Sequence, residues 1–161
     1  WVQGSPWGWQ ATPVHRAVLD GQIEITRDAP LPAFTGCSLD DNPGAGHLGS
    51  GDLNGQINGY LLWETDSLTD KPDAWEVTIW LDESAPEAEC TVNLTPRRCR
   101  RFAPKKDDRV SWTGTRVSDG RRLQRGRAQA GEHGLVTAEG LRVGKTKQRI
   151  RFEKQGATRR R

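Results

Sequence analysis

Three histidines, His15, His47 and His133, are the side chains that could act as a general base near neutral pH. A serine hydrolase places such a base beside a nucleophile, commonly on a Gly-x-Ser-x-Gly turn, and the sequence contains no such motif. None of the histidines has a Glu or His at the spacing of a metal site. We therefore predict no catalytic residue in this chain. His15 is interpreted as structural, with a role as triad base as the alternative.

A second group of candidates lies in segment 37–55, whose many Gly, Asp and Asn residues are typical of a long surface loop. Its oxygen-bearing side chains at Asp40, Asp41, Asp52 and Asn54 are of the kind that binds calcium. An EF-hand loop beginning at Asp52 would need Glu at its twelfth position, where this chain has Trp63. Ordinary Asx-turns are the preferred interpretation, and calcium binding is the alternative.

Arginine is the third candidate, because its guanidinium group binds carboxylate, sulfate and phosphate. Residues 97–161 hold 21 of the 24 Lys and Arg but only six of the 21 Asp and Glu, although the net charge of the chain is just +3. On a strand, Arg98 and Arg100 would share one face and could bind a polyanion. Few aromatic residues are interleaved with the arginines, which argues against nucleic acid. Solvated strand faces are the preferred interpretation.

The three cysteines, Cys37, Cys90 and Cys99, form no Cys-x-x-Cys pair and so do not predict a zinc site. Their spacing allows one disulfide with a third thiol, or three reduced thiols. The seven tryptophans supply large core residues and also candidates for stacking on sugar rings. We predict Trp80 and Trp112 as the aromatic binding candidates, since Trp80 falls on the polar face of its strand.

The elements that must position these side chains are short strands. Residues 75–81 alternate apolar and polar side chains, the pattern of a half-buried strand, with Trp75 on the apolar face. Further strand-like runs are separated by turn residues. They lie at 57–64, 91–94, 109–117, 123–130, 135–138, 141–143 and 148–153, with Pro96 expected to stop the second of these and a hairpin turn at 118–120. Without a convincing amphipathic helix, this pattern predicts a mostly β fold, an antiparallel β-sandwich of immunoglobulin or fibronectin type.

The composition also predicts how the chain is divided. Residues 56–154 are expected to form the sandwich, 37–55 a loop or linker, and 155–161 a disordered basic tail. Residues 1–36 contain one expected helix or strand, at 14–26, and are too interrupted by proline to form a domain. The first residue is Trp1 and methionine is absent, so we expect a fragment of a longer protein. No membrane span or leader peptide is expected.

Several segments together resemble a known kind of protein: PAFTGCSLDDNPG, GDLNGQINGYLLWE, DAWEVTIWL, CTVNLTPRRC and HGLVTAEGLRV. They look like the carboxyl-terminal region of uncharacterised bacterial secreted proteins that pair an α/β-hydrolase-like domain with a terminal β-sandwich. The resemblance implies that residues 1–36 are the tail of that upstream domain and that the chain is extracellular or periplasmic. It also implies a parent that is an esterase or depolymerase, with its nucleophile outside this chain.

Three hypotheses of function follow. The first is a non-catalytic terminal sandwich that stabilises or positions the catalytic domain, with the upstream domain of the same polypeptide as its partner. The second is an independent carbohydrate-binding module that takes a polysaccharide on exposed, coplanar rings around Trp80 or Trp112. The third is a binder of acidic glycan or nucleic acid that uses the arginine-rich half of the chain.

Overall fold

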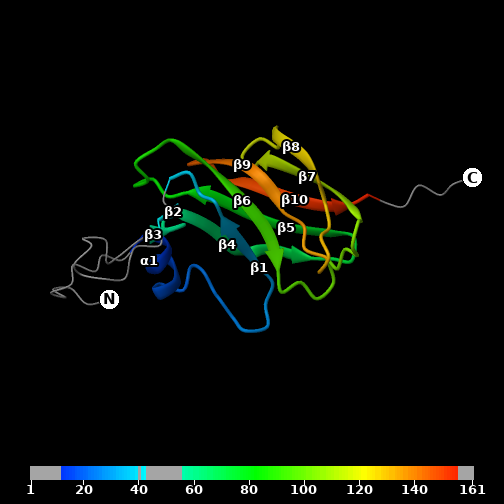
Figure 1. Ribbon diagram of the computed structural model, residues 1–161. Coiled ribbons are helices and arrows are strands. Elements are labelled where there is room, and N and C mark those ends of the chain that lie inside the picture. The colour runs from blue at the N-terminus through cyan, green and yellow to red at the C-terminus, as the bar shows by residue number, and fades with distance from the viewer. Residues whose placement is uncertain (1–11, 40, 43–55, 156–161) are drawn as a thin grey trace, which may run out of the picture.

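The computed structural model describes residues 12–39, 41–42 and 56–155, in which strands predominate (Figure 1). The one helix of this part of the chain is α1 (Pro13–Leu19). The strands are β1 (Leu31–Thr35), β2 (Asp41–Asn42), β3 (Gln56–Ile57), β4 (Leu61–Asp70), β5 (Ala74–Leu81), β6 (Glu89–Arg97), β7 (Arg109–Arg116), β8 (Arg122–Gln129), β9 (Ala138–Gly144) and β10 (Gln148–Lys154). In the described ranges, no helix has the length and apolar character needed to cross a bilayer.

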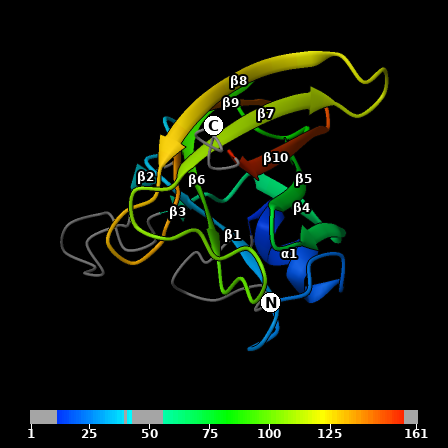
Figure 2. The same ribbon diagram turned by 90° about the vertical axis from the view of Figure 1, so that its right-hand side faces the viewer.

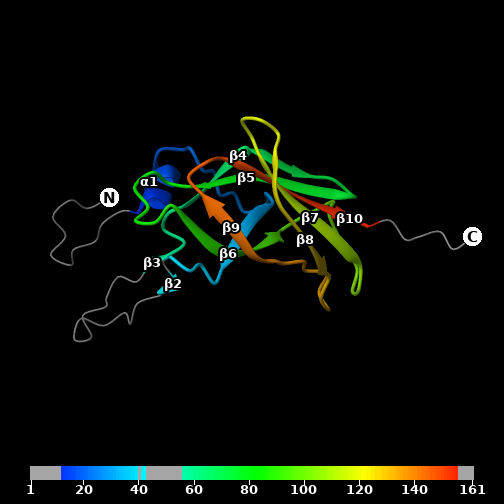
Figure 3. The same cartoon turned by 90° about the horizontal axis from the view of Figure 1, so that it is seen from above.

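The strands form the antiparallel β-sandwich that the sequence predicts. One sheet has five strands in the order β4-β5-β10-β7-β8, and the other has three in the order β1-β6-β9. Strands β2 and β3 form a separate short pair. In Figure 2, β7 and β8 arch together as a long hairpin, whereas α1 lies beside β4 at the opposite edge of the five-stranded sheet. Figure 3 shows α1 and the C-terminal end of β10 at opposite ends of the sandwich.

The core lies between the two sheets, and β5 shows why the sequence predicts it well. Its alternating side chains include Trp75 and Val77, which are fully buried. They stand opposite Phe152 and Ile150 on β10, which are also fully buried. The rings of Trp75 and Phe152 meet edge to face with centroids 5.8 Å apart, a favourable aromatic geometry. The prediction of a strand with Trp75 in the core is confirmed.

Two strands run further than the sequence indicates. Strand β6 continues through Pro96, which was expected to stop it. Pro96 lies beyond the stretch of β6 that pairs with β9 and faces Pro32 of β1, so a missing N–H there breaks no β9 ladder bond.

Strand β4 similarly continues through the polar stretch after residue 64 by way of a bulge between Glu64 and Thr69. At this bulge the Ser67 hydroxyl replaces the missing ladder bond. It donates to the Glu64 carbonyl at 2.7 Å and accepts from the Thr78 amide at 2.8 Å. A polar side chain can therefore extend a strand that hydrophobic periodicity alone would end.

The sandwich begins earlier than the predicted residue 56. Strand β1, inside the range assigned to an upstream domain, pairs with β6 from Leu31–Arg97 to Thr35–Asn93. The expected element at 14–26 is the shorter helix α1, which a capping box starts: the Thr12 hydroxyl accepts from the His15 amide. Pro13 at its first position suits a helix start.

The outward-facing Thr78 of β5 provides a test of this packing. Its hydroxyl is buried without a hydrogen-bond partner, and the residue is 1% exposed. We expect Thr78→Val to raise the free energy of unfolding by about 1 kcal/mol, because it removes a buried unsatisfied polar group at constant shape. Urea denaturation measures the change. Thr115→Val, on the half-exposed part of the same face, is the control and should shift stability by less than about 0.5 kcal/mol; a loss in Thr78→Val would contradict the buried hydroxyl.

Candidate functional site

Trp80 lies on the outer face of the five-stranded sheet, where the chain's own N-terminal segment covers much of it. It belongs to an apolar cluster in which Ala17, Ile23 and Leu62 are buried. The Lys147 ammonium lies 4.4 Å from the Trp80 ring centroid and 2.8 Å from a Glu64 carboxylate oxygen. The hollow left beside this ring has a volume of about 210 Å³. Trp80 is thus a half-buried member of a cluster rather than an open stacking surface.

Trp112 faces the opposite way, into the sandwich. It is 8% exposed and belongs to the main core. Its ring lies against Gly126 of β8 so closely that a Cβ added there would be 2.5 Å from ring carbons. Because Trp112 and Trp80 lie on different faces of the sheet, they do not form one coplanar platform. No described aromatic residue is classed as exposed.

Arg98 and Arg100 are not on a strand but in the loop that follows β6, where Arg98 has a φ of 55°. The Arg98 guanidinium donates to the Thr26 carbonyl at 3.2 Å. The Arg100 guanidinium lies 3.6 Å from the Asp28 carboxylate. Both side chains therefore hold the 26–28 segment against the loop, and the structure brings neither of them to Trp80 or Trp112.

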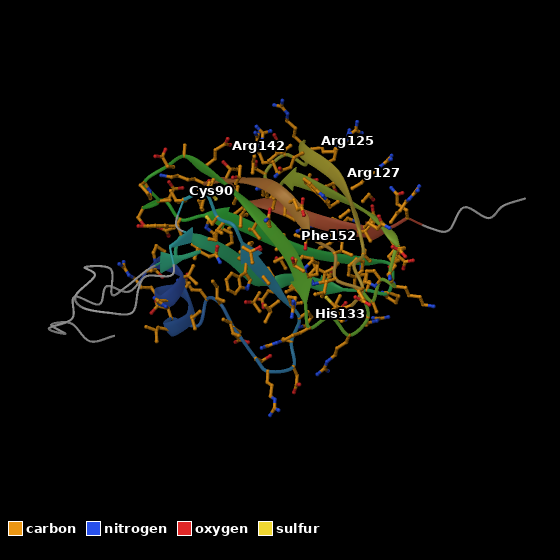
Figure 4. The ribbon with its side chains drawn as sticks, viewed as in Figure 1. Cys90, Arg125, Arg127, His133, Arg142 and Phe152 are labelled. Atoms are coloured by element: carbon orange, nitrogen blue, oxygen red, sulfur yellow. The ribbon has the colours of Figure 1, made fainter. Side chains whose placement is uncertain are left out.

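The cysteine and histidine side chains of the described residues do not form a catalytic arrangement with one another. Cys37 and Cys90 are buried in the core, and all three cysteines are thiols in this structure. Burial, with the nearby Asp70 carboxylate adding to it, raises the pKa of Cys99 to about 12, so this thiol stays protonated at neutral pH. The imidazole of His15 completes the capping box of α1, and His133 is exposed in the turn before β9 (Figure 4).

The predicted calcium ligands fall mostly outside the described residues. The structure does not describe Asp40, Asp52 or Asn54, nor His47 from the same segment. It describes Asp41 only through the backbone of β2. Within the part of the chain that the structure describes, no group of three or more His, Cys, Asp and Glu could hold a metal ion.

The structure also shows a positively charged surface. From the sequence alone, its arginines are interpreted as belonging to separate solvated strand faces. The pairing of β8, β7 and β10 brings Arg125, Arg127 and Arg149 onto the uncovered half of the outer face, and all three are exposed. The i, i+2 spacing of Arg125 and Arg127 was the available sequence signal. Arg149 joins them only because β10 lies beside β7 in the folded sheet.

The fold and these surroundings define the class of protein: an antiparallel β-sandwich with a covered apolar end and an open arginine-rich face. Comparison of the chain with protein-family models, with curated proteins and with solved structures found no match.

Proposed function

We propose that this chain is a non-catalytic accessory β-sandwich of a larger secreted, hydrolase-like bacterial protein. Its role is to stabilise the catalytic domain or to position it near substrate, outside the cell or in the periplasm. The upstream domain of the same polypeptide is its partner. The kind of parent protein is inferred from the resemblance of the sequence segments. The surface of the N-terminal segment is where we expect the upstream domain to make contact.

The observation that carries the proposal is an apolar strip on and after α1. Val18, Leu19 and Ile25 have exposed fractions of 37%, 64% and 55%. In the same segment, the buried residues Ala17 and Ile23 belong to the apolar cluster against which Trp80 packs, and this contact fixes the segment to the sandwich. Three of the six large hydrophobic residues that are exposed in the described part of the chain thus fall within residues 18–25, and exposed hydrophobic residues that gather on a surface mark contact sites. A preceding domain that rests on this strip would be held by a segment already packed on the sheet.

The roles of the potentially reactive residues are consistent with a supporting function. His15 has a capping role in α1, and the Cys99 thiol is protonated at neutral pH. The Asp70 carboxylate accepts three backbone amides of the loop after β6. His15 and Asp70 thus have structural roles in the part of the chain that is described, and the Cys99 thiol is not the thiolate that a nucleophile requires.

The test is hydrogen exchange on the 161-residue chain and on a longer polypeptide that carries a hydrolase-like domain before residue 1. We expect residues 18–25 to exchange more slowly in the longer polypeptide, because a docked domain would cover the strip and restrain its backbone. Leu19→Gln with Ile25→Gln should remove that protection and lower the melting temperature of the preceding domain. Val117→Gln with Leu135→Gln, at exposed hydrophobic residues elsewhere on the sandwich, is the matched control. Equal exchange at residues 18–25 in both polypeptides would overturn the docking role.

A further inference from the structure

The uncovered half of the outer face has an ordered arrangement of side chains. Thr113 of β7 stands opposite Arg125 of β8 on one side and Arg151 of β10 on the other. In the neighbouring rows, Ser111 stands opposite Arg127, and Thr115 stands opposite Arg149. Paired residues project from the same side of a sheet, so Thr113 and Thr115 lie between guanidinium groups of β8 and β10, whereas Ser111 lies between Arg127 and Glu153.

Most of this positive charge is uncompensated. The outward acids Glu76 and Glu153 both bind Arg151, the latter at 2.7 Å. The hydrogen bond to Glu153 and the charge of Glu76 hold the pKa of Arg151 above its usual value. The other outward arginines of these strands form no ion pair within the described ranges: Arg109, Arg122, Arg125, Arg127 and Arg149. Figure 4 shows Arg125 and Arg127 extending away from the body of the sandwich.

The surface is also hollowed where the arginines meet β7. Gly126 has no side chain, and the Trp112 ring fills the space beneath it. An open hollow of about 460 Å³ lies here, with Ser111, Thr113, Arg125 and Arg127 among its lining residues. Successive outward residues of one strand are about 7 Å apart, and neighbouring strands about 5 Å. Guanidinium groups are thus available at intervals along an extended chain rather than at one point.

The chemistry of these side chains selects the ligand. Guanidinium groups bind carboxylate and sulfate in bidentate fashion, and Ser and Thr hydroxyls both donate to and accept from sugar hydroxyls. Single-stranded nucleic acid needs aromatic rings for stacking, but the rings of Trp112 and Phe152 point into the core and β8 has no aromatic residue. A two-stranded ribbon can enter the major groove of a duplex, but this face spans three strands, with Arg149 on β10.

We propose that the outer face of β8, β7 and β10 binds an acidic polysaccharide, with Arg125, Arg127 and Arg149 as the anionic-group ligands and Ser111, Thr113 and Thr115 as hydroxyl partners. The covered apolar end with α1 lies at the other edge of the same sheet. The glycan site therefore does not depend on docking to a hydrolase domain, and either proposal can fail while the other stands.

The test measures binding of the full chain to heparin, to polygalacturonate and to an oligothymidylate at about 0.15 M salt and over a salt series. Arg125→Gln, Arg127→Gln and Arg149→Gln combined should weaken glycan binding at least about tenfold and lower the salt slope by about 2 to 3, since three charged contacts are lost. Polygalacturonate carries only carboxylates, whereas heparin carries sulfates as well, so binding to heparin alone would identify sulfate as the recognised group.

The matched control removes the same charge elsewhere, with Arg27→Gln, Arg97→Gln and Arg101→Gln, and should change affinity less than about twofold. All six positions are exposed, so thermal unfolding should show both triple variants folded, with only small changes in stability. Equal losses in the two variants, or no glycan binding by the unaltered chain at any salt concentration, would overturn the site. Tighter binding of oligothymidylate that the face variant abolishes would instead make the ligand a nucleic acid.

Discussion

Replacing Gly134 by alanine is expected to lower the free energy of unfolding by about 3 to 5 kcal/mol. The residue has a φ of +69°, a conformation that costs an L-residue about 1 to 2 kcal/mol. A Cβ there would also lie 2.3 Å from the carbonyl oxygen of Pro104, a backbone atom that cannot rotate away. The turn is closed by a 3.0 Å bond from the Gly134 amide to the Gly131 carbonyl, so the backbone must deform.

Gly120→Ala separates these two causes. Gly120 has a nearly identical φ of +71°, but an added Cβ would meet nothing within 4 Å. Its loss should be about 1 to 2 kcal/mol, from backbone strain alone. Urea denaturation of both variants gives the comparison. Similar losses in the two variants would mean that the contact between the 131–134 turn and Pro104 is absent in solution.

Replacing Asp70 by alanine is expected to cost about 3 kcal/mol. Its carboxylate accepts the amides of Arg100, Arg101 and Phe102 at 2.6, 3.0 and 2.7 Å, which ties the end of β4 to the loop after β6. Bonds to a charged group are among the stronger hydrogen bonds, and their loss leaves three amides without that acceptor. Phe102 is 4% exposed, so the loop cannot move into water without uncovering it.

Asp70→Asn should retain part of this stability, because an amide keeps one acceptor oxygen but loses the charge. Asp66→Ala is the matched control. Asp66 is exposed and its carboxylate forms no hydrogen bond or ion pair within the described part of the chain, so the loss of stability should stay below about 0.5 kcal/mol. Differential scanning calorimetry orders the three variants, and an Asp70→Ala value equal to that of the control would contradict the anchoring role.

The sequence predicts the fold well where hydrophobic side chains alternate. Strand β5 and its core face follow directly from residues 74–81, and the β7–β8 hairpin follows from the turn at 118–120. Prediction from the sequence fails where a strand continues past a residue pattern that normally ends one. Ser67 carries β4 through its bulge, and β6 passes Pro96 where it no longer pairs with β9. Hydrophobic periodicity reports which side chains are buried. The Ser67 hydroxyl and the position of Pro96 instead affect backbone hydrogen bonds, so periodicity does not reveal them.

The candidate site also has some features that the sequence predicts and others that depend on the folded sheet. The abundance of arginine in residues 97–161 and the polar-face position of Trp80 are properties of the sequence. Which arginines gather on one surface depended on the strand order, since β10 inserts between β5 and β7 and so places Arg149 in the same row as Thr115 and Arg122. Arg98 and Arg100 are adjacent to other arginines in the sequence, but their side chains contact Thr26 and Asp28 of the same chain.

The sequence by itself thus determined a β-sandwich, its principal core residues and its basic half, because strand burial has a period that neighbouring residues reveal. Only the tertiary structure decided that α1 covers Trp80, that β1 completes the smaller sheet and that an arginine-rich face stays open. These outcomes join residues distant in the chain. Their pairing depends on strand order and register, which local side-chain patterns do not encode.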